Sequence, residues 1–164
     1  FTHLSLPFVQ QNTSDDRMLI LTSVQEALTA FLKPEQMAST FTWNCQVCGS
    51  TAPPFKVSDV ISTSEVLILQ LNRWANIGQQ GALLHRVESI REITFGSQRY
   101  SLCRFVSRIG PSTRSGHYTC CVKNHCSRGE WWYYNNSTRR LASSSDMETS
   151  HAERTYLGIY ERIP

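Results

Sequence analysis

The segment that most limits the fold is Val66-Leu-Ile-Leu-Gln-Leu71, an almost unbroken run of β-branched residues and leucine. It is too short for an ordinary helix and far too short to span a bilayer. Apolar side chains at both odd and even positions predict a central strand that is buried on both faces. Residue patterns also predict strands at 1–7, 41–48, 55–61, 92–95, 100–107, 117–122, 130–134 and 155–161.

Helical signals are few and local. Ser23-Val-Gln-Glu26 has the spacing of a capping box, and apolar residues then recur at helical spacing through Leu32. The Ser-rich segment 142–153 holds a second cap, Ser143-x-x-Asp146, which predicts one helical turn. Many strands and few helices indicate an α+β architecture dominated by antiparallel sheet.

Composition narrows the class of protein. With 164 residues, 40% hydrophobic and 18% charged, the chain suits one domain or a large part of one. The net charge of +3 comes without a Lys/Arg stripe, and no apolar run is long enough to cross a bilayer, so we expect neither a nucleic-acid nor a membrane partner. The chain opens at Phe1 directly in a strand-like pattern, so we expect it to be part of a longer protein.

Six cysteines are present, and their pattern favours reduced thiols. Cys120 and Cys121 are neighbours on a predicted strand, so their side chains point to opposite faces, and no secretory signal is visible. This predicts a cytoplasmic or nuclear protein. Cys45-x-x-Cys48 has the spacing of half of a tetrahedral zinc site. A redox role for the pair would need a βαβ context, which the sequence does not show. A third hypothesis, a zinc-ribbon nucleic-acid binder, is supported only by this pair and by the mild excess of basic residues.

Gly116-His117-Tyr118 follows a loop rich in Gly and Ser, and Trp131-Trp-Tyr-Tyr-Asn-Asn136 lies one predicted hairpin later. Two antiparallel strands joined in this way can bring His117 beside Asn135. A histidine oriented by an asparagine is two-thirds of a nucleophile–base–orienter triad. The amide oxygen would accept one imidazole N–H, and the other ring nitrogen would then face a thiol.

Seven segments, in order, resemble the ubiquitin-specific protease family. They are Phe1-x-x-Leu-Ser-Leu-Pro7, the 23–33 helix, Trp43-Asn-Cys-x-x-Cys48, Val66-Leu-Ile-Leu-Gln-Leu-Asn-Arg-Trp74, Tyr100-x-Leu with Gly110 and Ser115-Gly-His-Tyr-Thr119, Trp131-x-x-Tyr-Asn-Asn136, and Tyr156-Leu-Gly-Ile-Tyr-Glu-Arg162. The resemblance implies a papain-like cysteine protease fold, of which this chain holds the antiparallel β palm and part of the fingers, without the helical thumb lobe. Fingers strands with an inserted helix would occupy about 1–65, and the palm about 66–164.

The same resemblance implies a deubiquitinase, which hydrolyses the isopeptide bond after the C-terminal Gly of ubiquitin. In that scheme His117 is the general base, Asn135 orients it, and Asn136 supports the oxyanion, although the family usually has Asp there. Gly116 and Tyr118 would bind the ubiquitin tail, because a missing Cβ suits a thin Gly-Gly segment. No metal or other cofactor takes part in catalysis, and the complete protein would hold structural zinc through Cys45, Cys48 and a second cysteine pair.

The nucleophile is the missing part. The family's cysteine lies in an Asn-x-Gly-x-x-Cys segment that this chain does not contain, so we expect no hydrolysis by the chain alone. Departures from the family pattern are Arg104, Arg108 where a His is frequent, and Gly158. These leave a second hypothesis open, a pseudo-deubiquitinase that binds ubiquitin or another partner without cleaving it.

Overall fold

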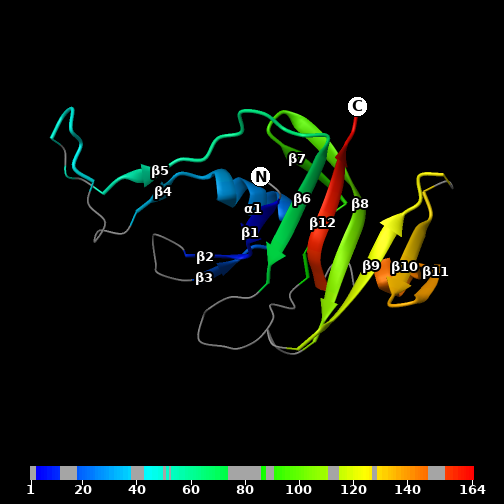
Figure 1. Ribbon diagram of the computed structural model, residues 1–164. Helices are drawn as coiled ribbons and strands as arrows, with labels where there is room; N and C mark the ends of the chain where they lie inside the picture. The colour runs from blue at the N-terminus through cyan, green and yellow to red at the C-terminus, as the bar shows by residue number, and fades with distance from the viewer. Residues whose placement is uncertain are drawn as a thin grey trace.

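The computed structural model describes residues 3–11, 18–37, 43–49, 51, 53–73, 86–87, 91–110, 115–126, 129–147 and 154–164. Most strands join one eight-stranded sheet in the order β1-β6-β12-β8-β9-β10-β11, with β7 pairing to β8 (Figure 1). The strands of this sheet are β1 (Leu4–Pro7), β6 (Val66–Asn72), β7 (Glu92–Phe95), β8 (Gln98–Ile109), β9 (His117–Lys123), β10 (Trp131–Asn135), β11 (Thr138–Leu141) and β12 (Thr155–Arg162).

Antiparallel pairs dominate the sheet, as the sequence predicted, but one parallel pair makes it mixed. Strand β1 runs parallel to β6, with Leu4 opposite Leu69, and every other pairing within the sheet is antiparallel. A parallel pair needs a long crossover connection, and here the connection holds the helix and two short two-stranded arms. Such a non-local pairing leaves no signal in the local residue pattern.

Strand β6 is an interior strand between β1 and β12, one position from the edge of the sheet, and it is not buried on both faces as predicted. Leu67, Leu69 and Leu71 are buried in the core, while Ile68 and Gln70 on the other face are only half-buried. The buried face packs against helix α1 (Val24–Leu32), whose Val24, Ala27 and Leu28 belong to the same hydrophobic cluster. One covered face and one open face are what an antiparallel or mixed sheet with a single helix allows.

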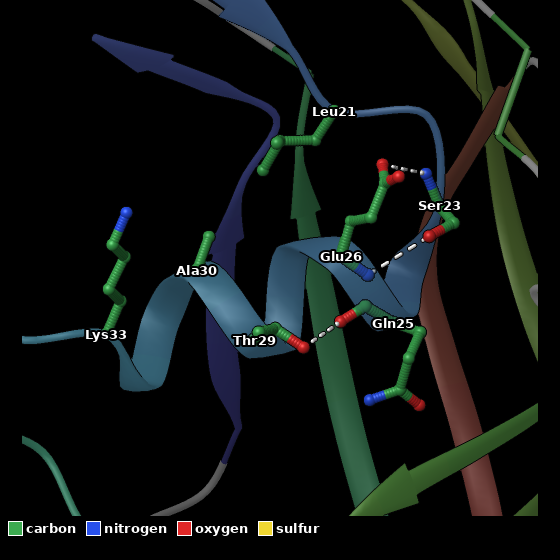
Figure 2. Close-up of a pocket in the computed structure, with 7 residues that line it drawn as sticks. All are labelled: Leu21, Ser23, Gln25, Glu26, Thr29, Ala30 and Lys33. Atoms are coloured by element: carbon green, nitrogen blue, oxygen red, sulfur yellow. Dashed lines mark hydrogen bonds between the residues drawn. The ribbon is translucent and has the colours of Figure 1, made fainter. Parts of the chain in front are cut away.

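Helix α1 begins with the predicted capping box. The Glu26 amide donates to the Ser23 hydroxyl at 3.0 Å, and the Ser23 amide donates to the Glu26 carboxylate at 3.3 Å (Figure 2). The next residue joins the helix to the sheet: the Gln25 amide group donates to the Thr94 carbonyl at 3.0 Å and accepts from the Thr94 amide at 2.8 Å. The side chain of Gln25 therefore continues the hydrogen bonding of edge strand β7.

Two short arms lie outside the main sheet. Strand β2 (Val9–Gln11) pairs with β3 (Met18–Ile20), and β4 (Glu35–Gln36) pairs with β5 (Phe55–Lys56). Figure 1 shows the second pair, the β4–β5 arm, at the left and away from the main sheet. The strand predicted at 41–48 is wrong over 43–48, because 43–45 is irregular and 46–48 is a turn; 41 and 42 lie outside the described residues. The strand predicted at 55–61 shrinks to two residues, since β-propensity without a paired neighbour does not make a strand.

The C-terminal elements follow the prediction closely. Strands β7, β8, β9, β10 and β12 coincide with the expected segments, and β11 is an addition that the polar sequence Thr-Arg-Arg-Leu did not indicate. The predicted Ser143–Asp146 cap is present: the Asp146 amide and the Ser143 hydroxyl lie 3.3 Å apart, and the Ser143 amide donates to the carboxylate at 2.7 Å. None of the helices in the described ranges has the length and apolar character needed to cross a membrane.

Candidate active site

The site is built at one rim of the sheet, where β9 begins and β10 ends. Tyr134 lies opposite Cys120 in the antiparallel ladder, so the next step along the same register brings Asn135 opposite Thr119. His117 lies two residues from Thr119 and therefore points to the same face. A diagonal pair of this kind is within reach of long polar side chains. The hairpin register thus places an imidazole and a carboxamide side by side.

The two side chains are in hydrogen-bond contact. His117 Nε2 lies 2.6 Å from Asn135 Oδ1, and both residues are half-buried. An amide oxygen only accepts, so Nε2 carries the proton and Nδ1 is the unprotonated, basic nitrogen of the neutral ring. The predicted juxtaposition of His117 and Asn135 is confirmed, and it leaves one ring nitrogen able to accept a proton.

The neighbours of His117 on the same strand lie differently. Tyr118 is 50% exposed on the opposite face, where its ring centroid is 5.9 Å from that of Tyr156. Tyr156 in turn accepts a hydrogen bond from the Gln70 amide at 3.0 Å. At Gly116, a Cβ would lie 2.7 Å from Nη2 of Arg108, so this protein's own arginine occupies the space that the missing side chain leaves. A role for Gly116 and Tyr118 in binding a ubiquitin tail stays a prediction.

Asn136 lies in the turn between β10 and β11 and is exposed. Its φ is +50°, the left-handed region, which asparagine enters at lower cost than most residues. The turn therefore gives a conformational reason for asparagine at this position. An electrostatic role for its amide stays a separate hypothesis.

The aromatic residues of β10 pack into the sheet only in part. Trp131 packs on the core, and its ring centroid lies 5.7 Å from that of Phe105. Tyr134, by contrast, is 37% exposed and is not part of the core. The guanidinium groups of Arg139 and Arg140 lie 4.0 and 4.2 Å from the ring centroids of Trp132 and Tyr133. Cation–π contacts of this kind cover the aromatic surface of the hairpin.

Three cysteines lie on the strands of the sheet, and none suits the role of nucleophile. Burial raises the pKa of Cys103 to about 11, raises that of Cys121 to about 12, and also raises that of Cys120. The thiolate is the reactive form, so these thiols are inert near neutral pH. Cys120 also points to the opposite face from His117. The second member of a cysteine–histidine pair is therefore not among these three thiols.

Cys45 and Cys48 lie in the segment between β4 and β5, far along the chain from His117. The backbone amides of Cys48 and Val47 donate to the Cys45 thiol and lower its pKa, and the Gly49 amide donates to the Cys45 carbonyl at 2.8 Å. A turn that stabilises thiolate is a suitable half of a metal site. Within the described residues, no group of three or more His, Cys, Asp or Glu side chains is placed to hold a metal ion.

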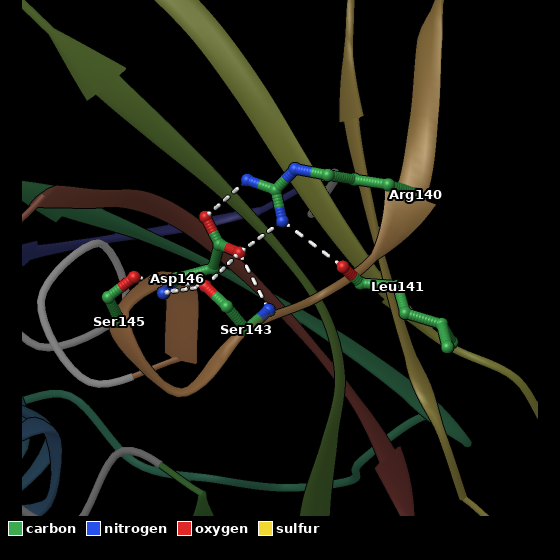
Figure 3. Close-up of polar contacts among 5 residues, drawn as sticks. All are labelled: Arg140, Leu141, Ser143, Ser145 and Asp146. Atoms are coloured by element: carbon green, nitrogen blue, oxygen red, sulfur yellow. Dashed lines mark hydrogen bonds and ion pairs between the residues drawn. The ribbon is translucent and has the colours of Figure 1, made fainter.

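Sequence reasoning missed the polar link that holds the hairpin carrying Asn135. Arg140 donates to both oxygens of Asp146, at 2.5 and 2.9 Å, and Ser143 also donates to this carboxylate (Figure 3). The cap Ser143-x-x-Asp146 was recognised as a local motif. Its contact with β11 depends on the fold, so no spacing rule indicates it.

A mixed sheet packed by one helix, with a His–Asn pair at its rim, defines part of a papain-like cysteine protease domain. Comparisons with known proteins agree. The family model "Ubiquitin carboxyl-terminal hydrolase" matches residues 9–160. The chain is 30% identical over 148 residues to human ubiquitin carboxyl-terminal hydrolase 42, which covers 85% of this chain, and 31% identical over 119 residues to mouse ubiquitin carboxyl-terminal hydrolase 17-like protein B, which covers 66%.

Solved structures agree with this family assignment. The SAGA DUB module of Ubp8, Sgf11, Sus1 and Sgf73 bound to monoubiquitin contains a chain that matches all of this one with a TM-score of 0.77 and 26% identity. The same module bound to ubiquitin aldehyde matches with a TM-score of 0.71. The chain therefore belongs to the ubiquitin carboxyl-terminal hydrolase family, with a fold of the ubiquitin-specific protease type. It spans 11% and 25% of the two curated relatives, and 36% of each solved chain.

Proposed function

We propose that this chain is the palm side of a cysteine-type deubiquitinase, which hydrolyses the isopeptide bond after the C-terminal Gly of ubiquitin. The 2.6 Å contact between His117 Nε2 and Asn135 Oδ1 carries the proposal. It holds the ring so that Nδ1 can take the proton of a cysteine thiol supplied by another part of the complete protein. The thiolate then attacks the carbonyl carbon, the imidazolium protonates the leaving amine, and water hydrolyses the acyl-enzyme.

The partner we propose is ubiquitin or a ubiquitinated protein. Support comes from the solved relatives, two of which are bound to monoubiquitin and to ubiquitin aldehyde. All six cysteines are free thiols, which supports a protein of the cytoplasm or nucleus. The chain alone supplies a base and its orienting group, and the thiols on its sheet are inert. We therefore propose that the chain by itself does not hydrolyse ubiquitin conjugates.

The test uses a ubiquitin C-terminal electrophile probe on the complete protein. We expect covalent labelling of the wild type and loss of about 10³-fold or more in labelling rate in His117→Ala, because the thiolate loses its base. Asn135→Ala keeps the base but frees the ring, so an intermediate rate is expected. His125→Ala, an exposed histidine paired with Glu161 at the far end of β9, is the matched control and should label as the wild type does.

Two outcomes would contradict the proposal. Full labelling in His117→Ala would show that this histidine is not the base. Ubiquitin binding without any labelling of the wild type would favour the second hypothesis, a pseudo-deubiquitinase, which the departures at Asn136 and Arg108 leave open. In a separate turnover assay, the isolated 164-residue chain should hydrolyse a ubiquitin reporter no faster than its own His117→Ala variant.

A further inference from the structure

Arg108 lies near the end of β8, directly opposite Tyr118 on β9. Directly opposed residues of an antiparallel pair point to the same face, so Arg108 and Tyr118 share one face. His117 precedes Tyr118 and points to the other face, where it contacts Asn135. Arg108 therefore lies behind the candidate base, on the far side of the strand, and any effect on the imidazole passes through the backbone.

The guanidinium of Arg108 lies flat on Gly116, the residue before His117. A Cβ built at Gly116 would lie 2.7, 2.8 and 2.9 Å from Nη2, Cζ and Nε of Arg108. Such similar distances to three atoms of one planar group mean that the plane faces the glycine. Nη2 also donates to the Ser115 carbonyl at 3.0 Å, and Cζ lies 5.9 Å from the Tyr118 ring centroid. One side chain thus contacts residues on both sides of His117.

The same backbone is held from a second direction by Gly110. A Cβ at Gly110 would lie 2.7 Å from the Ser115 carbonyl oxygen and 2.8 Å from the Gly116 Cα, and the φ of Gly110 is +151°. Both the close approach and the dihedral require glycine there. The Ser115–Gly116 backbone is therefore enclosed between the Gly110 backbone and the Arg108 guanidinium. His117 follows at once, so this enclosure sets the point from which its side chain starts.

We propose that Arg108 is a positioning residue for His117. It stacks on Gly116, bonds Ser115, and so fixes the backbone that aims the imidazole at Asn135 and at the incoming thiol. The proposal rests on the proposed function of His117, but the geometry it describes is a property of the strand itself. A planar guanidinium can lie on a glycine and donate sideways at the same time, whereas the ammonium of lysine cannot, so Arg108→Lys should restore little.

The primary test measures the order of the His117 ring by 13C relaxation at Cε1 in the complete protein. Arg108→Ala should lower the order parameter of this bond, from the range of rigid groups (about 0.85) toward that of mobile ones (below about 0.6), and Arg108→Lys should give nearly the same result. Arg104→Ala is the matched control: it lies on the same face of the same strand and pairs with Glu161 at 3.8 Å. The order parameter of the His117 ring in Arg104→Ala should equal that of the wild type.

A double-mutant cycle tests the route through the backbone. Gly116→Ala should expel the guanidinium at little cost in stability, because the nearest atoms belong to the end of a flexible side chain. It should therefore reproduce the Arg108→Ala effect, and the double variant should add nothing to either one. An unchanged order parameter in Arg108→Ala, or additive effects of the two changes, would overturn the proposal.

Turnover separates positioning from substrate binding. Arg108→Ala should lower kcat by about tenfold and leave KM within about twofold, because misplacing a catalytic group affects the transition state more than the bound substrate. A raised KM with unchanged kcat would overturn the positioning role. The ring-order measurement needs no turnover, so failure of the proposed function, seen as full labelling in His117→Ala, is distinguishable from failure of this inference.

Discussion

At the scale of single residues, the site depends on which atom of each side chain is free to act. The Asn135 oxygen engages Nε2 of His117, so the neutral ring keeps Nδ1 as its basic nitrogen. Asn136, one residue later, has a backbone reason for its identity because its φ is +50°. A role in the turn conformation and a role in supporting the oxyanion therefore predict different effects of substituting Asn136.

Asn136→Gly should preserve stability, because glycine enters the left-handed region freely, whereas Asn136→Ala should destabilise the fold by about 1 kcal/mol. If the amide supports the oxyanion, Asn136→Gly of the complete protein should lose about 10²-fold in kcat. Thermal unfolding and reporter hydrolysis, with Ser137→Ala as the control in the same turn, measure the two effects. A kcat equal to that of the wild type in Asn136→Gly would show that Asn136 serves the turn conformation and does not support the oxyanion.

At the scale of elements, strands β9 and β10 carry the site, and the Arg140–Asp146 pair holds β11 to the turn that follows it. Hydrogen bonds from Arg140, and then from Ser143, hold the pKa of Asp146 below its ordinary value of 3.8. Asp146 is buried, whereas Arg140 has 47% of its side chain exposed, so salt screens this pair in part.

The depressed pKa of Asp146 predicts an acid-sensitive hairpin. A carboxyl group whose pKa is lower in the folded state contributes stability that is present above the unfolded value of 3.8 and is lost as pH falls toward the folded value. The melting temperature of the wild type should therefore fall more than that of Asp146→Asn between about pH 5 and about pH 2. Asp59→Asn, an exposed aspartate outside this network, is the control. Parallel pH profiles for the wild type and Asp146→Asn would contradict the prediction.

At the scale of the whole molecule, the β4–β5 arm and the main sheet carry different candidate sites. The sheet presents the His–Asn pair, and the Cys45–Cys48 turn lies in the connection that crosses from β1 to β6. We propose that these thiols form half of a tetrahedral zinc site and that a second pair in the complete protein closes it. Structural zinc stabilises a fold outright, so the arm would depend on both halves.

The zinc proposal predicts a loss of metal without a change in the site. Cys48→Ser in the complete protein should reduce bound zinc, measured by mass spectrometry of the metal, from about one equivalent to none, and should lower the melting temperature. Cys126→Ser, an exposed cysteine in the β9–β10 connection, is the control. A full equivalent of zinc in Cys48→Ser would show that this pair is not a ligand.

Local chemistry determined what the sequence could predict by itself. The Ser23–Glu26 box, the Ser143–Asp146 cap and the His117–Asn135 hairpin pair depend on contacts between residues close in the chain. The strands of the C-terminal half were visible in their own residue patterns. The tertiary structure alone decided that Arg108 fills the space at Gly116, because the packing of a side chain on a neighbouring strand follows from no spacing rule. It also decided that β1 runs parallel to β6 and that the face of Ile68 and Gln70 stays half-open. Those two features depend on which distant segments meet, and residue periodicity carries no record of that.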